Sequence, residues 1–465
     1  MTNDASGRDA AISHATGEID NGNFERVLAR RVAIPSASRV AACRPELERY
    51  LVEEIKPHFE RMGFTVELFR NDIAPGPFLL AERIEGDDLT TVLQYGHGDV
   101  VAGLDDSWSE GLSPFAMTRR GERWYGRGTA DNKGQHSVNM AAIEAVLAER
   151  GHLGFNLKYL VEMAEESGSI GLEEFCSEHR NRLKADVFIA SDGPRLALDD
   201  PTIFLGARGG ISFGLEVNAR QSFQHSGNWG GLLSSPAIQL CHAITALVER
   251  TGRIRVRDLT PGEIPGNVKT ALRACKLAPQ PDDPAIEEWW GEPGLSAEEK
   301  VFAWSSLDVM EMECGRLDAP LSAIPPKARA RMQLRFPVGV DVEGVVPAVR
   351  KALAEAGFDR VEVKDSTDAI FKASRLDPDH PWVRKIASSI ERTLGRAPSI
   401  LPNLGGSLPN NIFCDLLGLP TIWIPHSYSG CLQHAPDEHL PISVAREGLA
   451  MMAGIYWDIG APGGD

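Results

Sequence analysis

The sequence contains no apolar run that could cross a membrane and no excess of positive charge. A membrane-spanning helix needs roughly 18 or more consecutive apolar residues, and no stretch of this chain comes near that length. Asp and Glu together number 65 against 48 Lys and Arg, which gives a formal net charge of -17. Because nucleic-acid-binding surfaces are basic, we expect neither a membrane nor a nucleic acid among the partners of this protein.

Paired cysteines and an apolar leader are also missing. The seven cysteines are scattered, odd in number and without a Cys-x-x-Cys pair, which is typical of reduced thiols in a cytoplasmic protein. Cys431 lies close to His434, but a small buried apolar residue is its simplest interpretation. Residues 1–23 are polar and lack the apolar core of a signal peptide. We therefore expect a cytoplasmic protein whose residues 1–23 form a mobile leader.

The length of 465 residues is large for a single hydrophobic core, so two domains are expected. Apolar strands alternate with helical patterns before residue 205, and the pattern changes after it. We predict an α/β fold, with a doubly wound mixed sheet covered by helices on both faces and a smaller inserted α+β domain. The predicted division is a catalytic domain of residues 24–205 and 371–465, with an inserted lid and dimerisation domain of residues 206–370.

Acidic residues and a histidine follow several of the predicted strands. His97 follows the strand 91–95, Glu166 follows a strand that starts near 157, and Asp192 follows the strand 185–190. Asp131 stands in a glycine-flanked turn before a helix that runs to about Arg150. Each position has an ordinary explanation as an exposed side chain, a turn or a cap. Doubly wound sheets gather ligands at the carboxyl ends of their strands. The repeated occurrence of such residues after strands therefore predicts that they form one common site.

The adjacent pair Glu165 and Glu166 is the centre of this predicted site. Successive side chains at the end of a strand point in opposite directions. One carboxylate can therefore bind a metal while its neighbour reaches a reacting water. The alternative is a solvated pair of glutamates at a turn. Asp99 lies two residues after His97 and could accept the second N–H of its ring.

These segments, with a later Gly-Gly-Ser loop and His434, resemble the M20 family of co-catalytic metallopeptidases. That family includes carnosinase-type dipeptidases, glutamate carboxypeptidase, acylases and succinyl-diaminopimelate desuccinylase. Five motifs occur in the family's order, from the His97 segment to the final His-x-Pro-x-Glu. The run from Glu165 to Leu172 is most similar to the carnosinase-type branch.

The resemblance implies a centre with two divalent metal ions. His97 and Asp192 would hold one ion, Glu166 and His434 the other, and Asp131 would bridge them. Asp99 would orient His97, and Glu165 would be the general base that activates the bridging water. The ligand set makes zinc the expected metal, with manganese and cobalt as alternatives. The peptide bond between Asp131 and Asn132 is expected to be cis.

The resemblance also implies how a substrate would bind. Arg335 matches an arginine that binds the substrate's carboxylate, and Gly405, Gly406 and Ser407 match a loop at the same end. His225 matches a histidine that reaches the active site of the other subunit and steadies the oxyanion. The protein would then be a homodimer formed through the inserted domain. Several relatives have an arginine before the glycine loop, where this chain has residues 401–404, Leu-Pro-Asn-Leu.

We therefore predict a hydrolase that cleaves an amide bond of a dipeptide or an N-acyl amino acid. The departure at residues 401–404 leaves open a second interpretation, a metal-dependent deaminase or a carbamoyl or aryl amide hydrolase of the same fold. A third is a metal-binding relative without catalytic activity, although the retained Glu165 argues against it. The chain contains no phosphate-binding P-loop.

Overall fold

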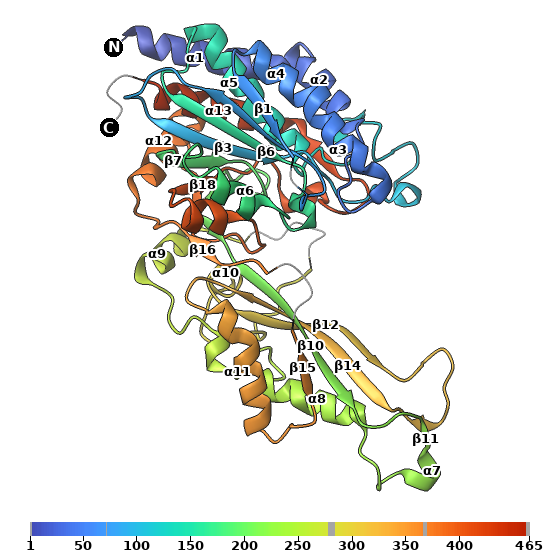
Figure 1. Ribbon diagram of the computed structural model, residues 1–465. Coiled ribbons are helices and arrows are strands. Elements are labelled where there is room, and N and C mark those ends of the chain that lie inside the picture. Colours follow the sequence, from blue (N-terminus) through green and yellow to red (C-terminus); the bar gives the residue numbers. More distant parts are fainter. Residues whose placement is uncertain (1, 71, 278–283, 366–369, 462–465) are drawn as a thin grey trace.

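A computed structural model describes residues 2–70, 72–277, 284–365 and 370–461. The molecule is elongated, with a larger body that holds both ends of the chain and a smaller one that projects from it (Figure 1). Within the described ranges, no helix combines the length and the apolarity needed to span a membrane.

The larger body contains an eight-stranded sheet in the order β1-β2-β6-β3-β7-β18-β8-β17. Its strands are β1 (Thr65–Phe69), β2 (Phe78–Arg83), β3 (Thr91–His97), β6 (Asn156–Glu162), β7 (Val187–Ala190), β8 (Thr202–Phe204), β17 (Ser399–Leu401) and β18 (Thr421–Trp423). The central strands β6, β3, β7 and β18 run parallel, whereas β1, β2 and β6 pair antiparallel. The sheet is therefore mixed, as the sequence predicts.

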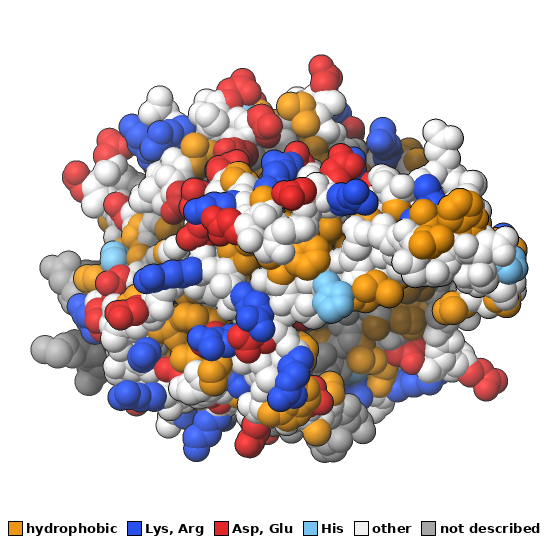
Figure 2. Space-filling view, turned by 90° about the horizontal axis from the view of Figure 1, so that it is seen from below, with side chains coloured by type: hydrophobic (Ala, Val, Ile, Leu, Met, Phe, Trp, Pro, Cys, Tyr) orange, Lys and Arg blue, Asp and Glu red, His pale blue; other side chains and the backbone are white. Residues whose placement is uncertain are grey.

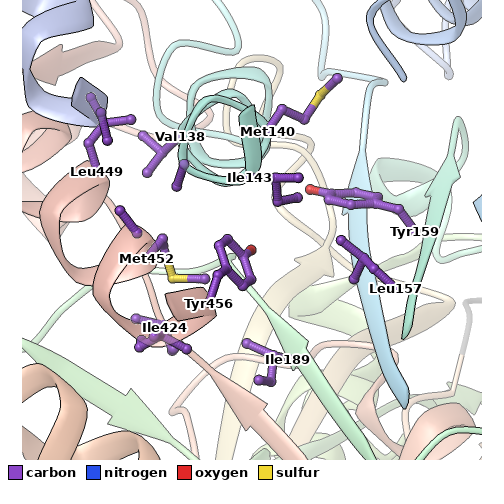
Figure 3. Packing of buried hydrophobic residues seen from close by; sticks show 14 of the residues in the cluster. Val138, Met140, Ile143, Leu157, Tyr159, Ile189, Ile424, Leu449, Met452 and Tyr456 are labelled. Carbon is purple, nitrogen blue, oxygen red and sulfur yellow. The ribbon is translucent and has the colours of Figure 1, made fainter. Parts of the chain in front are cut away.

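Alternate residues of the central strands supply two separate hydrophobic cores. In β7, Val187 and Ile189 belong to one core, while Phe188 and Ala190 belong to the other. The first core is closed by α5 (Lys133–Arg150), α12 (Pro381–Leu394) and α13 (Ile442–Ile459). Figure 3 shows Val138 of α5 and Leu449 of α13 in this core, with strand residues such as Ile189 beneath the helices. Helices thus cover both faces of the sheet, because α6 (Leu172–Glu178) packs into the second core.

The expectation of a mobile leader differs from the structure. Residues Thr2–Asp20 form helix α1, which packs against α5 and α13 along the top of the larger body in Figure 1. Ala11 and Ala15 are fully buried in the first core, and Arg8 pairs with Asp458 at 3.0 Å. The polar composition concealed this helix, because small alanines and ion pairs dock it in place of large apolar side chains.

The smaller body contains a four-stranded antiparallel sheet in the order β12-β14-β10-β15. Its strands are β10 (Gly209–Asn218), β12 (Ser306–Cys314), β14 (Lys327–Phe336) and β15 (Glu362–Lys364), and it carries the helices α8 (Pro236–Leu247) and α11 (Val342–Glu355). Side chains from this sheet and these helices form a third hydrophobic core. Strand β9 (Gly206–Ala207) pairs with β16 (Ser374–Arg375) where the chain leaves and re-enters the larger body.

The structure adds detail to one predicted feature of the insertion. Part of the irregular segment 252–320 packs on the larger body, because Leu272 of α9 (Gly266–Ala274) and Phe302 of α10 (Ala297–Phe302) join its second core. The predicted boundary after residue 370 follows residues 366–369, which lie outside the described residues, as do residues 278–283 and 462–465.

Candidate metal centre

The predicted ligands converge at the carboxyl ends of three parallel strands. His97 is the last residue of β3, Asp192 follows the end of β7 at Ala190, and Glu166 lies in the short turn η4 (Glu165–Ser167) just after β6. Asp131 lies two residues before the start of α5, and His434 comes from the loop after β18. All but His97 line a cavity of about 760 Å³ between the two bodies. The register of the parallel strands therefore brings together residues that are far apart in the sequence.

Asp131 is shared by two clusters of potential metal ligands. The first consists of His97, Asp131 and Asp192, and the second of Asp131, Glu166 and His434, with ligand atoms within 4.8 Å of one another in each. Asp131 Oδ1 lies 3.1 Å from His97 Nε2, and its Oδ2 lies 3.2 Å from His434 Nε2. The two oxygens of a single carboxylate thus face two different histidines, which is the geometry that a bridging ligand requires.

The remaining ligand atoms complete each cluster. Asp192 Oδ2 lies 3.5 Å from His97 Nε2, and Glu166 Oε2 lies 3.0 Å from His434 Nε2. Glu166 Oε1 and Asp192 Oδ2 are buried and form no hydrogen bond with any residue that the structure describes. Buried carboxylate oxygens without a donor are costly, and a divalent cation would satisfy them.

The electrostatics of the site also favour bound cations. Burial alone would lower the pKa of His97, but its contacts with Asp131, Asp192 and Asp99 raise that pKa well above its usual value. The hydrogen bonds that His434 donates to the carboxylates of Asp131 and Glu166 raise the pKa of His434 to about 11. Burial raises the pKa of Glu166 to about 7. Nitrogen and oxygen donors with an excess of negative charge suit zinc, manganese or cobalt.

Asp99 contacts both His97 and the turn that carries Glu165 and Glu166. Its Oδ1 lies 3.3 Å from His97 Nδ1, the ring nitrogen that points away from Asp131. Its two oxygens also accept hydrogen bonds from the backbone N–H groups of Glu165 and Glu166, both at 3.1 Å. Asp99 is fully buried. A single carboxylate therefore connects the end of β3 to the turn that carries both glutamates.

Glu165 lies beside the two clusters without belonging to either. It lines the cavity, and within the described residues its carboxylate makes no hydrogen bond or ion pair. Burial, reinforced by the nearby charges of Asp192 and Glu166, raises the pKa of Glu165 well above its usual range. A carboxylate with a raised proton affinity and no partner is suited to accept a proton from a nearby group.

Glu438 is an important residue of the site that we did not single out from the sequence. Its Oε1 accepts hydrogen bonds from the backbone N–H groups of Gly128, Ala130 and Asp131, each at 3.0 Å. Its Oε2 accepts a 2.7 Å bond from Arg127 Nη1. These bonds fix the loop that presents Asp131, whose peptide bond to Asn132 is cis, as expected. The signal in the sequence was its spacing of four residues after His434.

The predicted substrate-binding residues are only partly brought together. Arg335, Gly406 and Ser407 line the cavity, and Arg335 Nη1 donates a 3.2 Å hydrogen bond to Ser407 Oγ. Gly405 takes a different role, since its carbonyl oxygen accepts a hydrogen bond from Arg208 Nε at 2.9 Å. The loop thus offers Ser407 to the cavity and is anchored through Gly405.

The unusual segment 401–404 has a largely structural role. Asn403 is fully buried, and its Nδ2 donates to the carbonyl oxygens of Ala207 and Ser374 at 3.2 and 3.1 Å. Asn403 therefore links β9 and β16, the two strands in which the chain passes between the bodies. Leu404 lines the cavity and gives it an apolar wall.

His225 does not reach the cavity of its own chain. It is exposed in β11 (Gln224–His225), at the far end of the smaller body in Figure 1.

The cavity also contains residues that sequence reasoning did not identify, because only tertiary packing places them there. They include Arg39, Ile211, Ser212, Arg331, Gln333, Phe371, Leu408 and Gln433.

Comparison with known proteins defines the class of this protein. The profile of peptidase family M20/M25/M40 matches residues 93–458, most of the chain, including all the residues of both clusters. The chain belongs to this family and is a metallopeptidase.

Individual relatives are dipeptidases. The chain is 35% identical to the Beta-Ala-His dipeptidase of Mus musculus over 72% of this chain and 69% of that protein. It is 26% identical to the Cys-Gly metallodipeptidase dug1 of Schizosaccharomyces pombe over 92% of this chain and 94% of that protein. The structure of human carnosine dipeptidase 1 shares the fold, with a TM-score of 0.77 and 23% identity, over 97% of this chain and 99% of that one.

Proposed function

We propose that this protein is a dinuclear metal-dependent dipeptidase that uses Glu165 as its general base. The observation that carries the proposal is the arrangement around Asp131, whose two oxygens face His97 and His434 in two clusters of ligands. Glu165 lines the same cavity, and its carboxylate has no hydrogen-bond partner among the described residues. The fold alone would not support an activity, whereas this arrangement supports metal-assisted hydrolysis.

In this proposal one ion is held by His97 and Asp192, the other by Glu166 and His434, and Asp131 belongs to both. Zinc is the expected metal, with manganese or cobalt as alternatives. When bound, the two ions supply Lewis-acid polarisation of the scissile carbonyl and acidify the attacking water. Asp99 keeps His97 in place by facing its second ring nitrogen.

Glu165 takes the proton of the attacking water and returns it to the leaving amine. Its raised pKa supports this role, because a higher proton affinity makes a carboxylate a stronger proton acceptor. Attack of the water forms the new C–O bond and turns the carbonyl oxygen into an oxyanion. The amide C–N bond then breaks as the carbonyl re-forms and the amine takes the proton from Glu165, which gives a free carboxylate and a free amine.

Arg335 and Ser407 bind the carboxylate of the substrate. A guanidinium group suits a carboxylate because it donates in a planar fork, and Ser407 lies within hydrogen-bonding distance of it. The relatives named as dipeptidases support a dipeptide as the substrate, and an N-acyl amino acid offers the same amide and carboxylate.

His225 would act from a second copy of the chain and stabilise the oxyanion there. The smaller body has features of an association surface, since exposed apolar side chains occur on its edge strand β12 and around α7 (Ser226–Trp229). They include Phe223, Trp229, Leu232, Val309, Met310 and Met312. Figure 2 views the molecule from this end and shows hydrophobic patches among the charged side chains. These patches support a homodimer formed through the smaller body.

The test is hydrolysis of Ala-Ala, N-acetyl-alanine and alaninamide, followed by mass spectrometry. We expect cleavage of the first two substrates, complete loss after treatment with a chelator, and recovery on adding zinc or manganese. Glu165→Gln should bind metal but lose activity. Activity that survives the chelator would refute the proposal. Release of ammonia from alaninamide alone would instead indicate a deaminase-like or amide-hydrolysing relative.

A further inference from the structure

Arg39 is a cation of the cavity that none of the roles above requires. It lies in the loop between α2 (Asn23–Val32) and α3 (Arg44–Tyr50) and lines the cavity beside Ser167 and Gly168. Its side chain is exposed and makes no hydrogen bond or ion pair with the residues that the structure describes. Arg331, in the same cavity, differs because both oxygens of Glu311 lie 3.2 Å from its Nη1.

The loop that carries Arg39 is fastened to the metal centre. Ser36 Oγ donates to the carbonyl oxygen of Gly98 at 2.6 Å, and the N–H of Val100 donates to the carbonyl oxygen of Ser36 at 3.0 Å. The hydroxyl of Ser167 donates to Ser38 Oγ at 2.9 Å. These contacts tie the residues before Arg39 to the turn of Glu165 and to the end of β3. The backbone at Arg39 is thus held close to the turn that carries Glu165.

The cavity therefore presents two guanidinium groups, one from each body, that form no ion pair among the residues that the structure describes. Arg335 comes from β14 of the smaller body and donates a hydrogen bond to Ser407, whereas Arg39 belongs to the larger body and follows Ser38, which is bonded to Ser167 in the turn of Glu165. The protein has 65 acidic residues against 48 basic ones, so carboxylates that could pair with an arginine are abundant. Two arginines that form no ion pair with a described residue in one cavity therefore indicate a ligand with anionic groups.

We infer that Arg39 selects substrates with an acidic group on the acyl side of the scissile amide. The inference rests on the proposed function: with its carboxylate on Arg335 and its amide at the clusters, a dipeptide extends its N-terminal residue toward Arg39. The preferred class is then a dipeptide whose first residue is aspartate or glutamate. Arg39 acts as a specificity residue, and the chemistry at Glu165 does not depend on it.

The experiment is a competition between matched peptides in one reaction. Glu-Ala is mixed with Gln-Ala, and Asp-Ala with Asn-Ala, so that each pair differs only in the charge of the first side chain. The ratio of products gives the ratio of kcat/KM directly. Wild-type enzyme is compared with Arg39→Gln and Arg39→Lys. The control is Arg61→Gln, which removes the same charge from an exposed position on α4 (Lys56–Arg61), outside the cavity lining.

We expect the wild-type enzyme to prefer the acidic peptide of at least one pair by about fivefold, the scale of an exposed ion pair. Arg39→Gln should remove this preference while cleaving Gln-Ala and Asn-Ala as well as the wild type does. Arg39→Lys should retain part of it, and Arg61→Gln all of it. The wild-type preference should also weaken in high salt.

Equal cleavage within both pairs by the wild type, or an unchanged preference in Arg39→Gln, would overturn the inference and leave the dipeptidase proposal intact. Failure of the metal-loaded enzyme to cleave any of the four peptides would contradict the dipeptidase proposal and the inference with it. Thermal unfolding of each variant shows whether the substitution has altered folding.

Discussion

The substitution Glu438→Gln tests how the loop that carries Asp131 is held. Glu438 and Arg127 are each 1% exposed in their side chains, and their charged atoms lie 2.7 Å apart. Glutamine fills the same space and keeps one oxygen for the N–H groups of Gly128, Ala130 and Asp131. It cannot neutralise Arg127, so a buried positive charge is left without a partner.

Breaking a buried ion pair by removing one partner costs about 3–5 kcal/mol, because the remaining charge stays desolvated. For a domain of this size, each kcal/mol corresponds to roughly 2–4 °C in the midpoint of thermal unfolding. We therefore expect Glu438→Gln to lower the unfolding midpoint of the larger body by about 6–20 °C. The loop that carries Asp131 should lose protection from hydrogen exchange before the rest of the larger body unfolds.

The assay combines thermal unfolding with hydrogen exchange measured by mass spectrometry on the peptide that spans residues 126–132. The matched control is Glu313→Gln on the smaller body, where the pair with Arg329 is 60% exposed on both sides. Exposed pairs contribute about 0–1 kcal/mol, so this control should change little. Equal effects of the two substitutions, or unchanged exchange near Asp131, would refute the reasoning.

Three further outcomes follow from the same contacts. Mixing the inactive variants His225→Ala and Glu165→Gln should restore about a quarter of wild-type activity. Half of the randomly mixed dimers contain one chain of each kind, and one of their two sites then combines an intact Glu165 with an intact His225. No recovery after confirmed subunit exchange would exclude a shared site. Arg335→Ala should lower kcat/KM for Ala-Ala by about 10- to 100-fold through loss of a charged hydrogen bond, and Arg335→Lys should lower it less; an equal loss for alaninamide would argue against carboxylate recognition. His58 is buried and its pKa is lowered for that reason, so the unfolded chain binds more protons and stability falls as the pH drops below the ordinary value of 6.5. His58→Gln should lessen the fall in unfolding midpoint between pH 7 and pH 5, measured by circular dichroism.

Part of the candidate metal site could be predicted from local patterns, whereas the roles of Asp131 and His434 came from the resemblance to the M20 family. His97, Glu166 and Asp192 come after apolar strands, and parallel strands bring their carboxyl ends to one edge of the sheet. The structure places all three within the two clusters around Asp131. The mixed sheet followed from the same alternation of strands and helices.

The residues that the sequence did not reveal depend on packing between distant segments. Glu438 closes the His-x-Pro-x-Glu motif, but its partners are backbone N–H groups near Asp131, 307 residues earlier in the chain, and the motif alone does not identify them. Helix α1 docks through alanines and ion pairs, which resemble the composition of a solvated leader. Arg39 enters the cavity only because its loop is bonded to Gly98 and Ser167.

The most direct test of the central proposal is the metal content of wild-type and variant protein together with their activity. We predict two zinc or manganese ions per chain in the wild type and in Glu165→Gln, with a loss of activity in that variant of about 100- to 10,000-fold, the usual contribution of a general base. Asp131→Ala should lose both ions and all activity, because both clusters share this carboxylate. A wild-type protein that hydrolyses dipeptides without bound metal, or a Glu165→Gln variant with normal activity, would contradict the account.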